Sequence, residues 1–502
     1  MENKAFDNEY YLSIQRENIL KRIEQFENKL YLEVGGKLFD DNHASRVLPG
    51  FEKDDKFQML LSLKEQIEIV IVVNSEDITK RKIRSDTGIT YDVEVERLIL
   101  TYKAHGFKVA GVVLSMYEDN PNTLVFSKHI KSFKIPIYHH YKIKGYPENI
   151  SLIVSEEGLG KNEYIKTERP LVVVTAPGPG SGKLATCLSQ LYYDHKRGIK
   201  SGYAKYETFP VWNLPLNHPV NIAYEAATVD LNDVNMIDPY YLEKTGEIAI
   251  NYNRDIEAFP LLKAIFEKIY GESPYYSPTH MGVNMVGYAI KDDETVQIAA
   301  NQEIIRRYYE SLKNNLLGSY TEEMVMKSQM LMQRVNVNPD DRPVVNKAKT
   351  YSDKVKAPVL AIQLKDGTIV TGKRSDLLSA SSAALLNALK KLANIDDKIP
   401  LLSRGVIEPI QTLKTESLKN ANPKIRAEEI LIALAIQAIT NPLAELALSK
   451  LKELNGLEAH SSSILASSDL KTLNKLGLRV TEEPQNFVTK IIKPSDKNIS
   501  SK

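Results

Sequence analysis

The chain contains very little cysteine and almost no net charge. Its single cysteine, Cys187, excludes an internal disulfide and a zinc site built from several thiolates, and it favours a reducing compartment. Lys and Arg number 65 against 64 Asp and Glu, which leaves a net charge of +1. Because no global field would hold such a protein on nucleic acid or on an anionic membrane, we expect neither as a partner.

Targeting signals and membrane spans are also missing from the sequence. The first residues, MENKAFDNEY, are polar and acidic, without the basic start and apolar run of a signal peptide. No stretch reaches the roughly 18 consecutive apolar residues that a membrane span needs. These absences predict a cytoplasmic protein.

The sequence does contain enough apolar residues for several hydrophobic cores. Hydrophobic residues make up 43% and charged residues 26% of the 502 positions, as is typical of globular proteins. A chain of this length exceeds one core and suggests about three domains. We predict an α/β domain over 1–256, a helical domain over 257–340 and a smaller α/β domain over 355–493.

Short apolar runs rich in β-branched residues recur in the first half of the chain. After a charged amphipathic stretch over 11–34, five such runs predict strands, and they lie at 68–73, 109–116, 135–140, 151–155 and 171–176. The segments between them have apolar residues at helical spacing. This alternation predicts a mostly parallel sheet with helices on both faces.

The rest of the chain changes character several times. Residues 201–255 are rich in Tyr, Asn, Pro and Asp, which predicts loops and short strands around a cleft. Few large apolar residues and several prolines and charges predict a linker over 338–358. An Asp366-Gly367 turn between two strand-like runs then predicts a hairpin, followed by a helix and, near 459–465, another strand.

A glycine-rich loop, APGPGSGK (176–183), follows the last of the five runs and leads into an amphipathic segment. Gly178, Gly180 and Gly182 allow the backbone to curl, so that successive N–H groups point inward. Ser181 adds a hydroxyl, and the start of the helix adds partial positive charge. We expect this loop to bind a phosphate or carboxylate, with Lys183 neutralising a bound phosphate.

The loop matches the phosphate-loop pattern of nucleotide-binding proteins only in part. Pro177 stands in place of the first glycine, and Leu184 in place of the Ser or Thr that helps to hold magnesium. Because this hydroxyl is missing, the case for a nucleoside triphosphate as the ligand is weaker. The alternative is a tight strand-to-helix turn in which the glycines serve shape alone.

Other polar residues are candidates for the same site. Arg46 would be a second clamp for an anion, although a capped helix start with a surface ion pair explains this residue equally well. Glu207 alternates with Lys205 on one side of a predicted strand, so both would face a cleft. Asp230 and Asp233 follow the glycine-rich loop in sequence, as a magnesium-binding or base-supplying carboxylate often does. A polar loop with Asx turns explains these two aspartates equally well.

Together these residues predict a set of roles. Lys183, Asp230 and Glu207 would be catalytic, whereas Gly178, Gly180, Ser181, Gly182, Lys183 and Arg46 would hold the ligand. Asp230 and Asp233 would bind Mg²⁺ together with a nucleotide. The scattered histidines indicate no metal cluster, and we expect neither zinc nor haem.

Four long sequence segments show a resemblance to a known family, and this resemblance covers nearly the whole chain. They are KLYLEVGGKLFDDNHASRVLPGF, KIRSDTGITYDVEVERL, VVVTAPGPGSGKLATCLSQLYYDHKRG and NLPLNHPVNIAYEAATVDLNDVNMIDPYYLE. They resemble an uncharacterised bacterial family catalogued as domain of unknown function eighteen forty-six. This resemblance implies a bacterial, cytoplasmic protein, and it implies no activity.

A second resemblance concerns the C-terminal part alone. The hairpin APVLAIQLKDGTIVTG followed by SSAALLNALKKLA looks like the start of a cytidine-deaminase-like domain. In that fold the helix start carries a His or Cys with a nearby Glu, and paired cysteines follow. Here Ser381 and Ser382 occupy the helix start and no paired cysteines exist, so the resemblance implies a zinc-less domain. With His460 and Ser461 these serines would line a polar pocket or a subunit contact, unless helix capping explains them.

The sequence therefore predicts a protein that binds a phosphorylated or nucleotide-like small molecule. If it is an enzyme, the predicted reaction is phosphoryl transfer or another nucleotide-dependent step. The alternative is a non-catalytic metabolite sensor or an assembly protein, in which the C-terminal unit forms a homo-oligomer.

Overall fold

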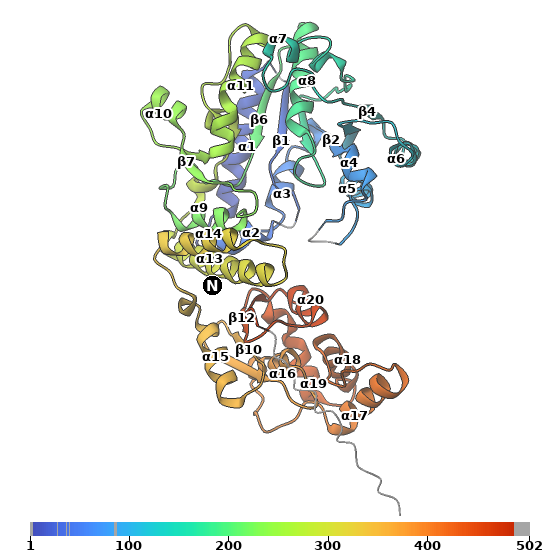
Figure 1. Ribbon diagram of the computed structural model, residues 1–502, viewed down its shortest axis with the longest axis vertical. Coiled ribbons are helices and arrows are strands. Elements are labelled where there is room, and N and C mark those ends of the chain that lie inside the picture. Colours follow the sequence, from blue (N-terminus) through green and yellow to red (C-terminus); the bar gives the residue numbers. More distant parts are fainter. Residues whose placement is uncertain (1–3, 28, 37, 40, 85–87, 486–502) are drawn as a thin grey trace, which may run out of the picture. The chain divides into compact units, whose positions relative to one another are not determined.

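The computed structural model describes residues 4–485 except 28, 37, 40 and 85–87. The chain divides into two compact units, Met1–Asn301 and Gln302–Lys502, and the division falls inside helix α13 (Asp293–Leu316). The sequence suggests three domains, and the helices of its middle part, 257–340, fall on both sides of this division. Each unit is coloured by sequence in Figure 1.

The first unit is built on a seven-stranded parallel sheet, as the sequence predicts in outline. The strand order is β4-β3-β2-β5-β1-β6-β9. Its strands are β1 (Leu30–Val34), β2 (Ile67–Asn74), β3 (Lys108–Ser115), β4 (Ile137–His139), β5 (Leu171–Thr175), β6 (Gly202–Tyr206) and β9 (Gly282–Val283). β2 and β5 are almost wholly apolar and buried, which is typical of strands covered on both faces.

Helices cover both faces of this sheet. Tyr203 and Tyr206 are three residues apart on β6, so their side chains point to opposite faces of the sheet. Tyr31 on β1 lies in register with Tyr203 and shares its face. The Tyr31 hydroxyl donates to Asp194 of α8 (2.8 Å), whereas Tyr206 meets Tyr11 of α1 on the other face. The helices of this unit that precede α13 are α1 (Asn8–Gln25), α2 (Asn42–Val47), α3 (Asp55–Leu61), α4 (Ser75–Thr79), α5 (Tyr91–Ala104), α6 (Pro121–Ser132), α7 (Ile150–Ile153), α8 (Lys183–Lys196), α9 (Pro219–Ala227), α10 (Pro239–Thr245), α11 (Asn253–Tyr270) and α12 (Pro278–Met281).

Two parts of the strand prediction are corrected by the structure. The run at 151–155 forms the short helix α7, because the Asn149 side chain accepts the N–H of Leu152 and starts a helical turn. The amphipathic stretch over 11–34 contains not only α1 but also β1, which lies in the interior of the sheet between β5 and β6.

The sheet reverses its winding direction between β1 and β5. From β1 the chain passes over β5 to reach β2, and from β5 it passes over β1 to reach β6. In parallel sheets the crevice at such a reversal, outside the carboxyl ends of the strands, is where ligands bind. The glycine-rich loop leaves β5 at this place, and Gly35 and Gly36 leave β1 beside it.

The segment 201–255 mixes strands and helices. After β6 it forms α9, the two-stranded ribbon of β7 (Asn235–Ile237) and β8 (Ile250–Tyr252), and α10 between them. The ribbon is antiparallel, with Asn235 opposite Tyr252.

The second unit has a smaller mixed sheet of order β11-β10-β12-β13. The predicted hairpin is confirmed: β10 and β11 are antiparallel and join at Asp366-Gly367, where Gly367 has a φ of 83°. The strands are β10 (Val359–Gln363), β11 (Ile369–Lys373), β12 (Glu458–Ser461) and β13 (Arg479–Glu482). The helices that follow α13 are α14 (Glu322–Arg334), α15 (Pro343–Val355), α16 (Ala380–Leu392), α17 (Arg404–Thr412), α18 (Ala427–Gln437), α19 (Pro442–Ser449) and α20 (Ser467–Lys475).

A helix, α15, occupies most of the stretch that the sequence predicts as a linker. Pro343 stands at the first helical position, where its missing N–H costs no hydrogen bond. Val344 and Ala348 then form a narrow apolar face that packs on Val359 and Ala361 of β10. Leu360 and Ile362, which point the other way, pack in the core that includes α16.

No helix in the described parts of the chain is long and apolar enough to cross a membrane.

Candidate functional site

The glycine-rich loop is a strand, loop and helix unit at the carboxyl end of β5. α8 begins at Lys183, and Gly180 and Gly182 have φ values of 71° and 90°, a conformation that favours glycine. A Cβ atom on Gly178 would lie 2.2 Å from the Tyr91 hydroxyl oxygen. The Ser115 hydroxyl donates to the Ser181 carbonyl (2.5 Å), which holds the loop against β3.

Most hydrogen-bond donors of this loop have no acceptor among the described residues. Among the described residues, no hydrogen bond involves the backbone N–H of Gly178, Gly180, Ser181, Gly182 or Lys183. The Ser181 side chain is buried, with the residue 2% exposed, and its hydroxyl also has no partner there. Buried polar groups are normally hydrogen-bonded. A hydroxyl without a partner beside amides without partners therefore indicates a place for a ligand.

Lys183 turns toward the neighbouring strand rather than toward bulk water. Its side chain is 14% exposed, and its Nζ lies 3.9 Å from Oε1 of Glu33 on β1. The other carboxylate oxygen of Glu33 accepts the Tyr203 hydroxyl (2.9 Å). Lys183 therefore connects the loop with β1.

Three charged side chains meet at the carboxyl end of β6. Lys205 Nζ lies 2.8 Å from Oε1 of Glu207 and 2.6 Å from Oδ2 of Asp255, the third residue of α11. Glu33 is next to Lys205 in the register of β1 and β6, on the same face of the sheet. The alternation of Lys205 and Glu207 thus places both in one cluster, as the sequence suggests. We name Glu33, Lys183, Lys205, Glu207 and Asp255 the charged row.

The charged row holds three carboxylates and two lysines, so it carries one excess negative charge when all five are ionised. Burial raises the pKa of Glu207 to about 7, against the attraction of Lys205 and with the help of Asp255. Although burial alone would lower it, Glu207 and Asp255 hold the pKa of Lys205 above its usual value. A pKa of about 7 means that Glu207 can gain or lose a proton near neutral pH.

Glycine also shapes this end of β1. A Cβ on Gly35 would lie 2.8 Å from Cγ of Glu207, so the glutamate side chain crosses the backbone at close range. Lys56, which is buried, donates to the Gly35 carbonyl (3.2 Å) and pairs with Asp41 (3.2 Å). These contacts hold the exit of β1 beside Glu207.

Aromatic rings lie next to Glu207. Phe209 stacks on Tyr224 with ring centroids 5.1 Å apart, and Tyr224 lies 5.6 Å from Tyr252. The His43 ring meets both Phe209 and Tyr224 edge-on. Burial, together with the nearby charges of Glu207, Asp41 and Asp233, raises the pKa of Tyr224 to about 12.

The remaining predicted residues belong to other segments of the chain. Asp230 is exposed, whereas Asp233 is buried and pairs with Arg254 (3.2 Å). Arg46 lies on α2. Among the described residues, no group of three or more His, Cys, Asp or Glu side chains has the arrangement of a metal site. The magnesium site at Asp230 and Asp233 and the clamp at Arg46 stay predictions.

Sequence reasoning missed Glu33 as a member of the site. The signal is a single acidic residue inside an apolar strand that ends in two glycines, LYLEVGG. A charge inside a buried strand needs a partner, and the two glycines indicate a close approach at the strand end. Cys187 is buried in α8, where burial raises its pKa well above the usual value, as expected for a structural thiol.

The second unit contains its own buried polar residues. The Ser382 hydroxyl donates to the Ile425 carbonyl (2.8 Å), and the Ser379 side chain caps α16. His460 contacts Thr481 (2.8 Å) and Glu483 (3.3 Å), and burial lowers its pKa. Helix capping accounts for the contact of Ser379, and the deaminase-like resemblance stays a prediction.

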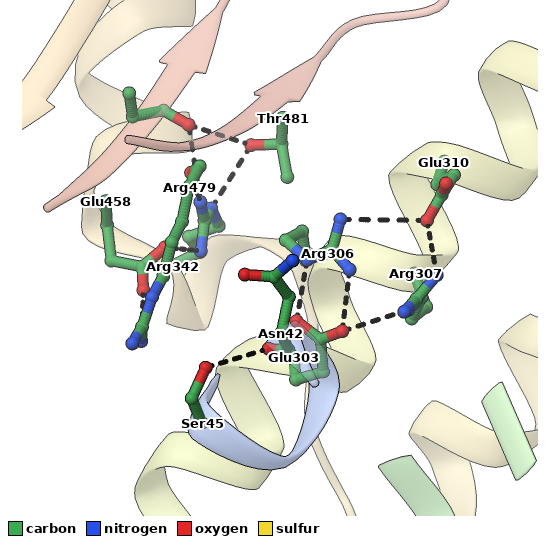
Figure 2. A network of polar contacts seen from close by, with 11 residues as sticks. Asn42, Ser45, Glu303, Arg306, Arg307, Glu310, Arg342, Glu458, Arg479 and Thr481 are labelled. Carbon is green, nitrogen blue, oxygen red and sulfur yellow. Dashed lines mark hydrogen bonds and ion pairs between the residues drawn. The ribbon is translucent and has the colours of Figure 1, made fainter. Parts of the chain in front are cut away.

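Arg342 is the most deeply buried Lys or Arg among the described residues of the second unit, and Figure 2 shows the network around it. The Arg342 side chain is fully buried. Its guanidinium donates to the Thr481 hydroxyl (3.1 Å) and to the Arg479 carbonyl (2.6 Å), and it pairs with Glu458 (2.5 Å). Nearby, Arg306 and Arg307 both bind Glu303.

Comparisons with known proteins cover almost the whole chain. Two family models match it, described as "Domain of unknown function DUF1846, N-terminal" over residues 4–336 and "Domain of unknown function DUF1846, C-terminal" over 340–491. A UPF0371 protein of Streptococcus pneumoniae (strain Hungary19A-6) is 53% identical over 484 residues, 96% of this chain and 98% of that protein. A UPF0371 protein of Streptococcus pyogenes serotype M5 (strain Manfredo) is 52% identical over the same shares. The family resemblance predicted from the sequence is confirmed.

Proposed function

Since the chain belongs to the DUF1846 family, whose description names no activity, we propose a function from the site itself: the loop at 176–183 binds the phosphate group of a small molecule. One observation carries this proposal. The loop leaves five backbone N–H groups and the buried Ser181 hydroxyl without a partner among the described residues, at the start of a 14-residue helix. Such donors together with the helix dipole favour an anion.

The position of the loop supports the same proposal. It lies where the winding of the parallel sheet reverses, the usual place for a ligand in such folds. Lys183 supplies a cation at the loop, and its long contact with Glu33 (3.9 Å) leaves its ammonium able to move toward a bound phosphate. Phosphoryl transfer is the reaction that the sequence suggests for this site.

Thermal shift with inorganic phosphate and a panel of sugar phosphates and nucleotides tests the binding. Each ligand that binds the folded protein raises its melting temperature. Ser181→Ala removes one donor to a charged group, about 1.5–3 kcal/mol, so we expect affinity to fall roughly 10- to 100-fold. Ser201→Ala is the matched control, because the Ser201 hydroxyl is also buried without a partner among the described residues. Ser201 directly precedes β6, so it lies at the amino ends of the strands, whereas the loop lies at their carboxyl ends.

Two results would contradict the proposal. The first is the absence of any shift with phosphate compounds, which is what a loop of purely structural glycines predicts. The second is an equal loss of binding in Ser201→Ala. Release of phosphate from ATP, GTP or sugar phosphates in the presence of Mg²⁺ separates catalysis from sensing: a thermal shift without release favours a metabolite-binding protein.

A further inference from the structure

The loop and Glu207 lie at the ends of strands that are not adjacent. β1 separates β5 from β6, so the two strand ends are about 10 Å apart at the usual spacing of about 4.8 Å per strand. Inorganic phosphate is too small to contact both places. A ligand that contacts both must extend from its phosphate across the end of β1.

The charged row spans this separation. Lys183 at the loop faces Glu33 on β1, Glu33 lies beside Lys205 on β6, and Lys205 pairs with Glu207. The five side chains of the row are between 11% and 23% exposed. They are therefore largely desolvated and still accessible from solvent.

Glu207 has unused hydrogen-bonding capacity. Its Oε1 pairs with Lys205, and no hydrogen bond of its Oε2 occurs among the described residues. A protonated carboxyl donates a hydrogen bond and an ionised one accepts it. Because Glu207 changes between these forms near neutral pH, it can bind either a hydroxyl or a carbonyl oxygen.

We propose that Glu207, positioned by Lys205 and Asp255, forms a second subsite that binds the hydroxyl or carbonyl groups of the same phosphorylated ligand. The ligand class is a sugar phosphate or polyol phosphate, with its phosphate at the loop and its carbon chain crossing the end of β1. This inference rests on the proposed function of the loop. It adds that the phosphate is the anchoring group and that recognition of the rest of the ligand takes place at β6.

Thermal shift and titration calorimetry with three probes test the subsite: inorganic phosphate, ribose 5-phosphate and glucose 6-phosphate. The wild-type protein should bind the sugar phosphates more tightly than inorganic phosphate. In Glu207→Gln the affinity for the sugar phosphates should fall about tenfold, while the affinity for inorganic phosphate should stay the same. Glu257→Gln, which changes an exposed carboxylate two residues after Asp255 on α11, is the matched control and should bind all three probes as the wild type does.

Gly35→Ala provides an independent variant. Its new methyl group would lie 2.8 Å from Cγ of Glu207 and would displace the side chain without changing its chemistry. It should therefore also weaken sugar phosphate binding more than phosphate binding, and it keeps the inference testable if Glu207→Gln does not fold.

The outcomes separate the two proposals. If the wild type binds sugar phosphates no better than inorganic phosphate, or if both variants keep the preference, the second subsite is wrong and the loop proposal stands. If inorganic phosphate and the sugar phosphates all fail to bind the wild type, the loop proposal fails and the subsite fails with it.

Discussion

The charged row of the first unit and the Arg342 network of the second are both buried, but they differ in how far solvent reaches them. In the second unit, Arg342 is fully buried and its guanidinium contacts Thr481, Glu458 and two backbone carbonyls (Figure 2). In the first unit, the charged row is 11–23% exposed, and the loop beside it has open N–H groups and an open hydroxyl at Ser181. Buried charge is common to both, so it does not identify a site. The difference is unused hydrogen-bonding capacity that solvent or a ligand can reach.

This difference separates structural from functional polar groups in terms that mutation can measure. A group whose partners are all within the protein contributes to stability, and its loss leaves those partners unpaired. A group without a partner contributes little to stability and is free to bind a ligand. The predictions below test both halves, beginning with the largest expected effect.

The largest effect is expected in the second unit, from Arg342→Ala. This substitution removes the buried partner of Glu458 and the donors to Thr481 and the Arg479 carbonyl. We expect a loss of about 3–5 kcal/mol in the free energy of unfolding, measured by urea denaturation. Arg479→Ala is the control, because Arg479 pairs with the same glutamate from a more exposed position and should cost under about 1 kcal/mol. Equal effects of the two variants would contradict the structural role of Arg342.

Next in size is the effect of Gly178→Ala on the loop. The new methyl group would lie 2.2 Å from the Tyr91 hydroxyl, in a well-packed region, so we expect a loss of about 2–3 kcal/mol. In Gly180→Ala the new methyl group has no atom within 4 Å. Only the φ of 71° disfavours alanine there, which lowers the free energy of unfolding by about 1–2 kcal/mol. Thermal and urea denaturation of the two variants give the comparison. A smaller loss in Gly178→Ala than in Gly180→Ala would show that the loop is not held against Tyr91.

A pH-dependent effect is expected from Glu207. Its pKa is about 7 in the folded protein against 4.5 as the ordinary value, so the folded state holds a proton between these values that the unfolded chain has released. The free energy of unfolding therefore decreases as pH rises from about 4.5 to about 7 and stays low above it. The Glu207→Gln side chain is neutral at every pH. Between pH 4 and pH 8, the free energy of unfolding of this variant should therefore rise by about 1–2 kcal/mol relative to that of the wild type. Urea denaturation at both pH values measures this gain, and Glu257→Gln should show none.

The smallest effect is expected from Ser181→Ala on stability in the absence of ligand. Its hydroxyl has no partner among the described residues, so we expect a change under about 0.5 kcal/mol. Ser382→Ala removes an equally buried hydroxyl that donates to the Ile425 carbonyl, and it should cost about 1–2 kcal/mol. A large loss in Ser181→Ala would mean that its hydroxyl has a structural partner and would remove the contrast between the units.

Most of the first sheet could be predicted from the sequence because its strands are unusually apolar. β2 and β5 consist mostly of Ile, Val and Leu, as is typical of strands that are buried on both faces. β1 was missed because Leu30–Val34 comes soon after the charged helix α1, at the end of the same amphipathic stretch. Its strand structure depends on pairing with β5 and β6, which local sequence does not encode.

The same reason applies to the candidate site. The loop at 176–183 is contiguous, so glycine spacing and the following helix reveal it. Lys205 and Glu207 share a strand face, which alternation reveals. Glu33 and Asp255 come from other elements, and only the register of β1 with β6 and the start of α11 brings them to Lys205. The helix α15 was missed because its apolar face, Val344 and Ala348, is narrow and gains stability by packing on β10.

The place of β1 in the sheet also affects how the chain can fold during synthesis. Leu30 pairs with Leu171 and with Gly202, so both neighbours of this strand are translated long after it. β2, β3 and β4 follow one another and pair in order, so they can assemble first. Until β5 emerges from the ribosome, the apolar residues of β1 lack their final partners, and pairings this distant in sequence slow folding. Protection of Leu30–Val34 from hydrogen exchange should therefore appear late on a growing nascent chain, after residue 206 has left the exit tunnel.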